Sequence, residues 1–245
     1  MKLHHRILMP AAALAAAASL GACASGPGAS AVPGAPSASA ARPGPSAAET
    51  AVRGLVVFDG CSLVNDTGLE GADMMPAQVM ALLPRGLEGV NLGVPGQTTA
   101  MMQADAAAQV DPLAKGRRDP VLVVWEGTND LVYGTDPPLD AAAAYRHLAA
   151  YCRERRRAGY RVVVLTVLPR EGSAEFDAAR TALNEKLRDG WRGFADGLAD
   201  VAADEAVGRA GAEFDEAYYR DTVHLTPAGY GVVARRVAEA VRALL

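Results

Sequence analysis

The sequence predicts an α/β fold in which a mostly parallel sheet is covered by helices on both faces. Over residues 54–245, short apolar segments alternate with longer segments of helical character. Several of the apolar segments are continuous and rich in valine, as strands buried on both faces are. Helices that alternate with such strands connect them in parallel and pack on the two faces of the sheet.

The predicted strands are short apolar segments that end at turn residues. They lie at residues 54–58, 89–92, 121–125 and 162–167, with an edge strand within residues 196–201. Helices are predicted at residues 76–83, 98–110, 139–158 and 174–194. A final helix begins at Pro227, with Thr226 as its N-cap. Its apolar residues recur at spacings of three and four, at Tyr230, Val233, Val237, Val241 and Leu244.

The first residues of the chain have the features of a secretory signal. Lys2 and Arg6 precede an almost unbroken apolar run over residues 7–20, and small residues then lead to Cys23. A basic start, a short apolar core and a small-residue exit are typical of a cleaved signal peptide. The run is shorter than the ~20 apolar residues that a membrane-spanning helix needs. We therefore predict a signal peptide at residues 1–22.

The end of this segment, Leu20-Gly21-Ala22-Cys23, resembles the lipobox of bacterial lipoproteins. The resemblance implies cleavage before Cys23, lipid attachment to its sulfur and a protein anchored in the cell envelope, facing the periplasm. Ala24 follows the cysteine, where an aspartate would favour the inner membrane, so the outer membrane is favoured. The alternative is an ordinary cleaved signal, which would leave a secreted or soluble periplasmic protein.

After Cys23, the chain up to residue 53 is almost entirely Ala, Gly, Pro and Ser, a composition that cannot bury enough apolar surface to offset the entropy of ordering. We predict that residues 23–53 form a disordered tether, which as a flexible coil spans roughly 30 Å. Residues 54–245 then make one domain. The formal net charge is −4, so nucleic acid is not an expected partner. An arginine cluster within residues 153–157 is interpreted as a solvated helix end.

Serine and histidine are scarce in the predicted domain, which narrows the search for a catalytic pair. Its only serines are Ser62 and Ser173, and its only histidines are His147 and His224. Ser62 directly follows the first strand, where ligands of parallel sheets bind, whereas Ser173 equally fits a helix N-cap. His147 lies within a long predicted helix. Ser62 is therefore the candidate nucleophile, with a simple turn residue as the alternative.

His224 lies in the loop Arg220-Asp221-Thr222-Val223-His224, just before the final helix. Asp221 is close enough to fold back onto the imidazole and fix its tautomer, which leaves the other ring nitrogen free to take a proton from a hydroxyl. The alternative is an aspartate that caps a turn beside a surface histidine.

Two further loops end at the same predicted edge of the sheet. Asn129 follows the third strand in Trp125-Glu126-Gly127-Thr128-Asn129-Asp130, and an amide there can donate to a developing oxyanion. Gly96 precedes a helix, at whose start free backbone N–H groups favour negative charge. Without a ligand, the same residues would simply form turns and helix caps.

In order along the chain, these loops resemble the signature blocks of the GDSL, or SGNH, hydrolase superfamily. The matching segments are Gly60-Cys61-Ser62-Leu63, residues 91–96 with Gly96 as the matching glycine, Gly127-Thr128-Asn129-Asp130, and Asp221-Thr222-Val223-His224. The resemblance covers nearly the whole predicted domain. It implies a three-layer α/β/α sandwich with a flavodoxin-like sheet. It also implies hydrolysis of acyl esters without a metal or cofactor.

The resemblance gives each matching residue a role. Ser62 would be the nucleophile, His224 the base and then the acid, and Asp221 the group that orients the imidazole. The oxyanion hole would consist of the Ser62 and Gly96 backbone N–H groups and the Asn129 side chain.

Cys61 stands where the superfamily has an acidic residue before the serine, and a thiol is a poor hydrogen-bond partner. This departure puts the level of activity in question without removing the nucleophile. Cys61 and Cys152 are expected to be buried free thiols rather than a disulfide. No His/Cys cluster in the sequence predicts a metal site.

The predicted function is hydrolysis of carboxylic esters with short acyl groups, or of glycan or lysolipid esters of the cell envelope. A thioesterase or an acyltransferase would use the same acyl-enzyme, and an inactive binding module is the alternative outside enzymes. Substrate choice is expected in residues 64–75, 131–138 and 170–176. Arg170 is a candidate substrate-binding residue there, although an arginine at such a place more often pairs with a nearby carboxylate.

Overall fold

The computed structural model describes residues 54–245. The predicted signal peptide at residues 1–22 and the predicted lipid site and tether at residues 23–53 lie outside the described residues. The described residues form a parallel sheet with the strand order β2-β1-β3-β4-β5. The strands are β1 (Leu55–Gly60), β2 (Glu88–Asn91), β3 (Val121–Trp125), β4 (Arg161–Leu165) and β5 (Gly197–Ala199).

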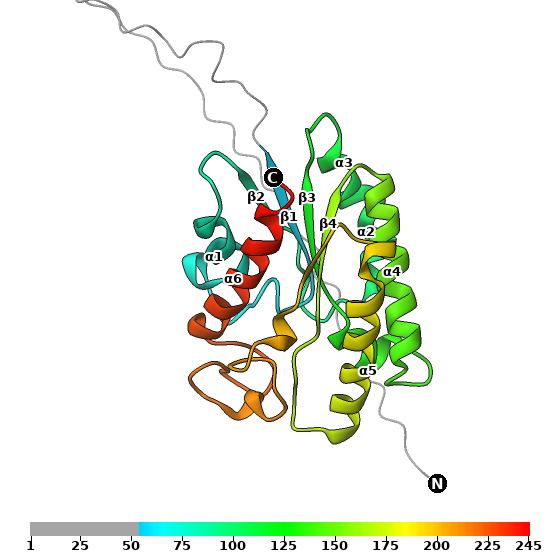
Figure 1. The fold of residues 1–245 in the computed structure, drawn as a ribbon, viewed down its shortest axis with the longest axis vertical. Coiled ribbons are helices and arrows are strands. Elements are labelled where there is room, and N and C mark those ends of the chain that lie inside the picture. Colours follow the sequence, from blue (N-terminus) through cyan, green and yellow to red (C-terminus); the bar gives the residue numbers. More distant parts are fainter. Residues whose placement is uncertain (1–53) are drawn as a thin grey trace, which may run out of the picture. The chain divides into compact units, whose positions relative to one another are not determined.

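Helices cover both faces of this sheet (Figure 1). On one face lie α1 (Met75–Leu82) and α6 (Pro227–Arg242), and on the other lie α2 (Thr99–Gln109), α4 (Ala141–Arg157) and α5 (Ala174–Gly190). The short α3 (Asp111–Ala114) follows α2. These three layers and the flavodoxin-like strand order confirm the predicted fold class.

The side chains of β1 point alternately to the two faces of the sheet and contribute to two apolar cores. Val56 and Phe58 belong to the buried cluster on the α1 and α6 side, whereas Leu55 and Val57 belong to the cluster on the other side. All four side chains are at most 1% exposed. Because β1 is apolar on both of its faces, it is stable only where helices cover each face of the sheet.

The direction of the strand order reverses at β1, because β2 lies on one side of it and β3 on the other. In open parallel sheets, ligands bind outside the carboxyl ends of the strands at such a point. Gly60 ends β1 beside Trp125 of β3. A Cβ atom at Gly60 would lie 2.1 Å from the Trp125 carbonyl oxygen, and its φ is +150°. Glycine therefore allows the loops after β1 and β3 to start close together.

The predicted elements are present, and several of them have shifted ends. α4 begins at Ala141 rather than at residue 139, because Leu139 has a φ of +64° and the Asp140 side chain caps the helix. α5 ends before Trp191–Gly193, a 3-10 turn that the sequence pattern joined to the helix. A π-helical turn at Asp130–Gly134 was not predicted, since no local periodicity marks it.

Two predicted helix caps are confirmed. The Thr226 hydroxyl accepts the Gly229 N–H at 3.1 Å at the start of α6. The Ser173 hydroxyl accepts the Phe176 N–H at 3.1 Å at the start of α5. Ser173 is thus engaged in the role that its sequence context suggested, which leaves Ser62 as the serine to consider for chemistry.

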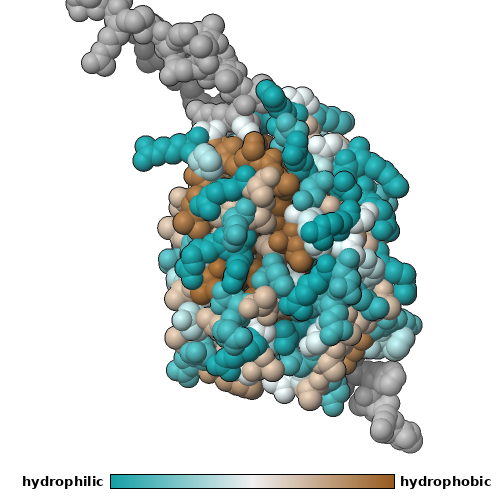
Figure 2. Space-filling view, in the orientation of Figure 1, coloured by the Kyte–Doolittle hydropathy of each residue, from teal (hydrophilic) through white to brown (hydrophobic). Residues whose placement is uncertain are grey.

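Cys61 and Cys152 are buried and free, as predicted. Polar residues cover much of the face seen in Figure 2, and apolar residues gather on the side formed by α1 and α6. Within residues 54–245, none of the helices is both long and apolar enough to cross a bilayer.

Candidate active site

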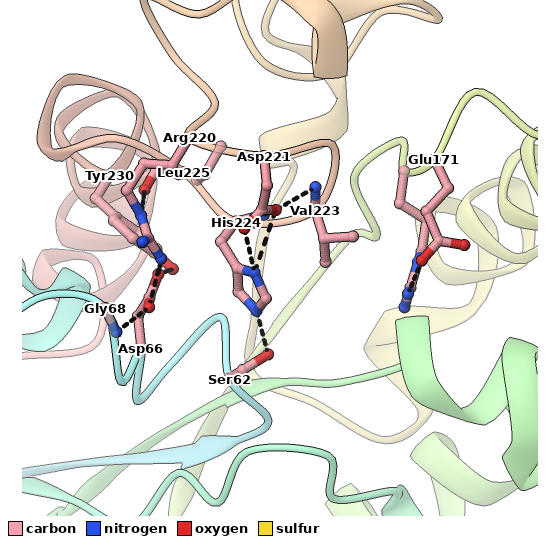
Figure 3. A network of polar contacts seen from close by, with 11 residues as sticks. Ser62, Asp66, Gly68, Glu171, Arg220, Asp221, Val223, His224, Leu225 and Tyr230 are labelled. Atoms are coloured by element: carbon pink, nitrogen blue, oxygen red, sulfur yellow. Dashed lines mark hydrogen bonds and ion pairs between the residues drawn. The ribbon is translucent and has the colours of Figure 1, made fainter.

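A hydroxyl, an imidazole and a carboxylate lie in a hydrogen-bonded row (Figure 3). Ser62 Oγ lies 2.9 Å from His224 Nε2, and His224 Nδ1 lies 3.0 Å and 3.2 Å from the two carboxylate oxygens of Asp221. With Nδ1 donating to Asp221, Nε2 carries the lone pair that accepts the serine proton. Such a row is able to take the proton from a serine as its oxygen attacks a carbonyl carbon.

Ser62 lies in a tight turn directly after β1. The Cys61 carbonyl accepts hydrogen bonds from the N–H groups of Val64 at 3.0 Å and Asn65 at 3.1 Å. The Asn65 side chain donates to the Gly93 carbonyl at 2.9 Å, which joins this turn to the loop after β2. Ser62 is half-buried and Cys61 is fully buried. The turn therefore points the hydroxyl outward and the thiol inward.

The loop that carries His224 is held by the neighbouring carboxylate. Asp221 Oδ1 accepts the N–H groups of Val223 at 2.8 Å and His224 at 2.7 Å. The Arg220 N–H donates to the His224 carbonyl at 2.8 Å. Burial opposes ionisation of Asp221, but the hydrogen bonds from His224 and Val223 outweigh it and lower the pKa of this carboxyl. Asp221 is thus held as a carboxylate against the imidazole.

An ion pair between the buried Asp66 and the partly exposed Arg220 joins the nucleophile turn to the histidine loop (Figure 3). Asp66 is 4% exposed, and Arg220 Nη2 lies 2.6 Å and 2.7 Å from its two oxygens. The Gly68 N–H at 2.8 Å and the Tyr230 hydroxyl at 3.1 Å donate to the same carboxylate. Arg220 Nε also donates to the Leu225 carbonyl at 3.2 Å. We call the Asp66–Arg220 pair the loop clamp.

Asn129 and Gly96 reach the same cleft as Ser62. Asn129 Nδ2 donates one N–H to the Gln97 carbonyl at 2.9 Å, which leaves the second N–H of the amide for a ligand. Gly96 has a φ of +79°, and a Cβ atom there would meet nothing within 4 Å. The structure therefore brings the predicted oxyanion residues together beside the predicted nucleophile.

The cleft around Ser62 has a volume of about 430 Å³. It is lined by Ser62, Gly96, Asn129, Tyr133, Arg170, Glu171, Asp221, Thr222, Val223 and His224. Arg170 forms an ion pair with Glu171 at 2.5 Å and donates to the Thr128 hydroxyl at 3.4 Å. It pairs with a neighbouring carboxylate and also faces the cleft, so its role toward a substrate stays a prediction.

Two other hollows lack this chemistry. One of about 450 Å³ is lined by Arg153, Arg156, Arg157, Tyr160, Gly193 and Asp196, without a serine or histidine. His147 lines another with Gln103 and Glu154, again without a serine. Among residues 54–245, no group of three or more His, Cys, Asp or Glu side chains is arranged to hold a metal ion.

Two buried acids at strand ends were not singled out from the sequence. Asp59 is 2% exposed, accepts the Tyr151 hydroxyl and faces α4, and burial raises its pKa to about 6. The strand alternation could have predicted this, because Asp59 lies two residues after Val57 and therefore on the same face of β1. Glu126 is 1% exposed and follows β3, and burial raises its pKa to about 8. Its place beside the cleft depends on strand order, which no local pattern reveals.

The sequence profile of the GDSL-like Lipase/Acylhydrolase family matches residues 59–232. The chain belongs to this family. The superfamily inferred from the signature blocks is therefore confirmed, and membership supports ester hydrolysis as the general class of reaction. The matched segment includes every residue of the hydrogen-bonded row and of the predicted oxyanion hole. No curated protein sequence matches this chain significantly.

Several solved structures share the fold of this chain. TesA has a TM-score of 0.63 at 18% identity, covering 78% of this chain and 99% of TesA. The acetyl xylan esterase AlAXEase has a TM-score of 0.57 at 18% identity, over 76% of this chain and 99% of the esterase. A mutant of Axe2, an acetyl-xylooligosaccharide esterase from Geobacillus, has a TM-score of 0.59 at 17% identity, over 77% and 94% of the two chains. At such low identity these similarities establish the fold alone.

Proposed function

We propose that this chain hydrolyses carboxylic esters through an acyl-enzyme on Ser62, with His224 as proton acceptor and Asp221 as its orienting group. The observation that carries the proposal is the hydrogen-bonded row in which Ser62 Oγ lies 2.9 Å from His224 Nε2. Membership in the GDSL-like acylhydrolase family supports the same class of reaction.

In the first half of the proposed reaction, Ser62 Oγ bonds to the carbonyl carbon of the ester as its proton passes to His224 Nε2. The carbonyl oxygen becomes an oxyanion, which the Ser62 and Gly96 backbone N–H groups and the second Asn129 N–H would hold. Asp221 stabilises the positively charged imidazole. The bond from carbon to the alcohol oxygen then breaks, and the imidazole gives its proton to the departing alcohol.

In the second half, a water molecule attacks the acyl-enzyme. His224 Nε2 takes a proton from the water as the oxygen bonds to the acyl carbon. The second tetrahedral intermediate uses the same oxyanion donors. Its collapse breaks the bond to Ser62 Oγ, which regains its proton, and the carboxylic acid leaves. Ser62 is half-buried in an open cleft, so water has access to the acyl group, which favours hydrolysis over transfer to a second alcohol.

We propose esters with a short acyl group and a polar alcohol as substrates. Arg170, Glu171 and Thr222 give the cleft a polar wall, and the exposed Tyr133 ring offers an aromatic surface beside it. Such a lining suits an alcohol with several hydroxyl groups, such as a sugar. The two acetyl-glycan esterases that share this fold make acetylated glycans the first substrates to test.

We also propose that the enzyme works in the cell envelope, anchored by lipid on Cys23. The basis is the sequence of residues 1–53, with its signal-like start, its lipobox-like end and its tether composition. Replacing Cys23 by serine should release the protein from the membrane fraction into the soluble fraction. Retention in the detergent-extracted fraction after this change would rule out lipidation as the anchor.

The proposed reaction is tested with p-nitrophenyl esters. The wild-type chain should hydrolyse p-nitrophenyl acetate faster than p-nitrophenyl octanoate, because Arg170 and Glu171 place charged groups in the lining of the cleft. Ser62→Ala and His224→Ala should each remove nearly all turnover, while Ser173→Ala, a matched change at the helix cap of α5, should keep it. Undiminished turnover in Ser62→Ala would overturn the proposal.

A further inference from the structure

Cys61 and Glu126 are buried at the ends of two neighbouring strands, where the turns that carry Ser62 and Asn129 begin. Cys61 directly follows β1 and Glu126 directly follows β3, and the register pairs the preceding residues, Gly60 and Trp125. Cys61 and Glu126 therefore begin neighbouring turns, and burial, together with the Glu126 carboxyl, raises the pKa of the Cys61 thiol. Glu126 is 1% exposed and Cys61 is 0% exposed.

Glu126 holds the turn that presents Asn129. Its Oε1 accepts the Gly127 N–H at 3.0 Å and the Asn129 N–H at 3.1 Å. Asn129 is thus fixed at both ends, because its side chain donates to the Gln97 carbonyl at 2.9 Å. The second oxygen of Glu126, Oε2, is buried without a hydrogen-bond partner.

We infer that Glu126 is a positioning residue for ester hydrolysis: its buried carboxyl holds the Gly127–Asn129 turn against the Cys61–Ser62 turn and so fixes the Asn129 amide at the oxyanion. This inference rests on the proposed function, in which Asn129 donates to the oxyanion. Glu126 does not touch the substrate itself. It acts through the backbone of Asn129.

The environment of Glu126 also sets its charge. Burial raises the pKa of its carboxyl to about 8, and the Asp130 carboxylate adds to the rise, while the N–H groups of Gly127 and Asn129 and the Cys61 thiol oppose it. Burial raises the pKa of Tyr133, and the Glu126 carboxyl also contributes to this rise. At neutral pH the carboxyl is therefore uncharged. Its ionisation at higher pH would place a negative charge beside the site where the oxyanion forms and would oppose catalysis.

Two substitutions, Glu126→Gln and Glu126→Ala, distinguish a positioning role in catalysis from a role in stability alone. Glutamine keeps an oxygen acceptor for the two N–H groups but cannot ionise. Glu126→Gln should keep kcat for p-nitrophenyl acetate within about threefold of wild type at pH 7. Above pH 8 the wild-type kcat should fall by about tenfold per pH unit, and this fall should be absent in Glu126→Gln. Glu126→Ala removes both acceptor bonds and should lower kcat by about 10- to 100-fold, with little change in KM.

Glu213→Gln is the matched control. Glu213 is also a buried glutamate (5% exposed) with an unpartnered Oε2, and it does not line the cleft. This variant should keep the wild-type pH profile. The inference is overturned by a folded Glu126→Ala that keeps the wild-type kcat, by a wild-type kcat that stays flat up to about pH 10, or by an alkaline fall that persists in Glu126→Gln.

Labelling of Ser62 by a fluorophosphonate separates this inference from the proposed function. If Ser62 is labelled and esters are hydrolysed, but the alkaline fall does not depend on Glu126, only the positioning role is wrong. If Ser62 is neither labelled nor required for turnover, the proposed function itself fails. Should Glu126→Ala not fold, the comparison of Glu126→Gln with wild type still decides the question.

Discussion

Replacing Asp66 by asparagine weakens the loop clamp without a large change in shape. The carboxylate of Asp66 receives two contacts from Arg220 at 2.6 Å and 2.7 Å, the Gly68 N–H and the Tyr230 hydroxyl. An asparagine at this position keeps one acceptor oxygen but loses the negative charge. Its NH₂ group would face the groups that now donate to the carboxylate, so these would lose an acceptor. The clamp holds the nucleophile turn on the histidine loop, so the change should affect both stability and catalysis.

The size of the effect follows from burial and charge. One hydrogen bond to a charged group contributes about 1.5–3 kcal/mol to the free energy of unfolding. Asp66 is almost fully buried, but the Arg220 side chain is 30% exposed, so solvent screens part of the pair. We expect Asp66→Asn to lower the free energy of unfolding by about 2 kcal/mol, which for a domain of this size is a fall in Tm of roughly 4–8 °C. A looser histidine loop should also lower kcat by about 10- to 100-fold.

A double-mutant cycle with Asp66→Asn and Arg220→Met measures the clamp directly. Urea unfolding of the two single variants and the double variant should give a coupling energy of about 1–2 kcal/mol, and the kcat loss of the double variant should be close to that of either single variant. Arg188→Met is the matched control. It breaks the pair of Arg188 with Asp200, at 2.8 Å and 2.9 Å and outside the cleft, and should change stability without lowering kcat. A coupling energy near zero together with unchanged kcat in Asp66→Asn would refute the reasoning.

Three further predictions concern single groups of the site. Asn129→Ala removes one oxyanion donor and should lower kcat by about 10²–10³, and an effect confined to KM would contradict that role. Asp221→Asn should lower kcat strongly through loss of the imidazole tautomer. The stability that Asp221 contributes, because its folded pKa is lowered, should disappear as the pH falls through the acidic range, so unfolding curves of the variant and wild type should converge there. Between about pH 5 and pH 8, the wild type should become steadily less stable relative to Glu126→Gln as the pH rises, because folded Glu126 retains a proton that the unfolded chain releases. Parallel stability curves for these two proteins would contradict the raised pKa.

The sequence predicted the layers of the fold because valine-rich strands and capped helices are local signals. The strand β3 and the start of α6 were predicted at their observed positions. The ends of α4 and α5 were less well predicted, since they depend on the positive φ of Leu139 and on a change to 3-10 geometry at Trp191. The spacing of apolar side chains does not indicate such local changes in backbone conformation.

Within the site, the small number of serines and histidines was the most useful signal for predicting the catalytic residues. The domain has few serines and histidines, so Ser62 and His224 stood out although 162 positions separate them. Aspartates and glutamates are common, and the partners of Asp66 and Glu126 are set by tertiary structure. Asp66 finds Arg220 from 154 positions away, and Glu126 reaches Cys61 only because β1 and β3 are neighbours. Neither pairing leaves a pattern in the linear sequence.

Fluorophosphonate labelling followed by peptide mapping tests the activated serine most directly. The reagent forms a covalent bond only with a hydroxyl whose proton a neighbouring base can accept. The wild-type chain should carry one label, on Ser62, and His224→Ala should remain unlabelled although Ser62 is still present. A label on another residue, or equally fast labelling of Ser62 without the imidazole, would contradict the proposed chemistry.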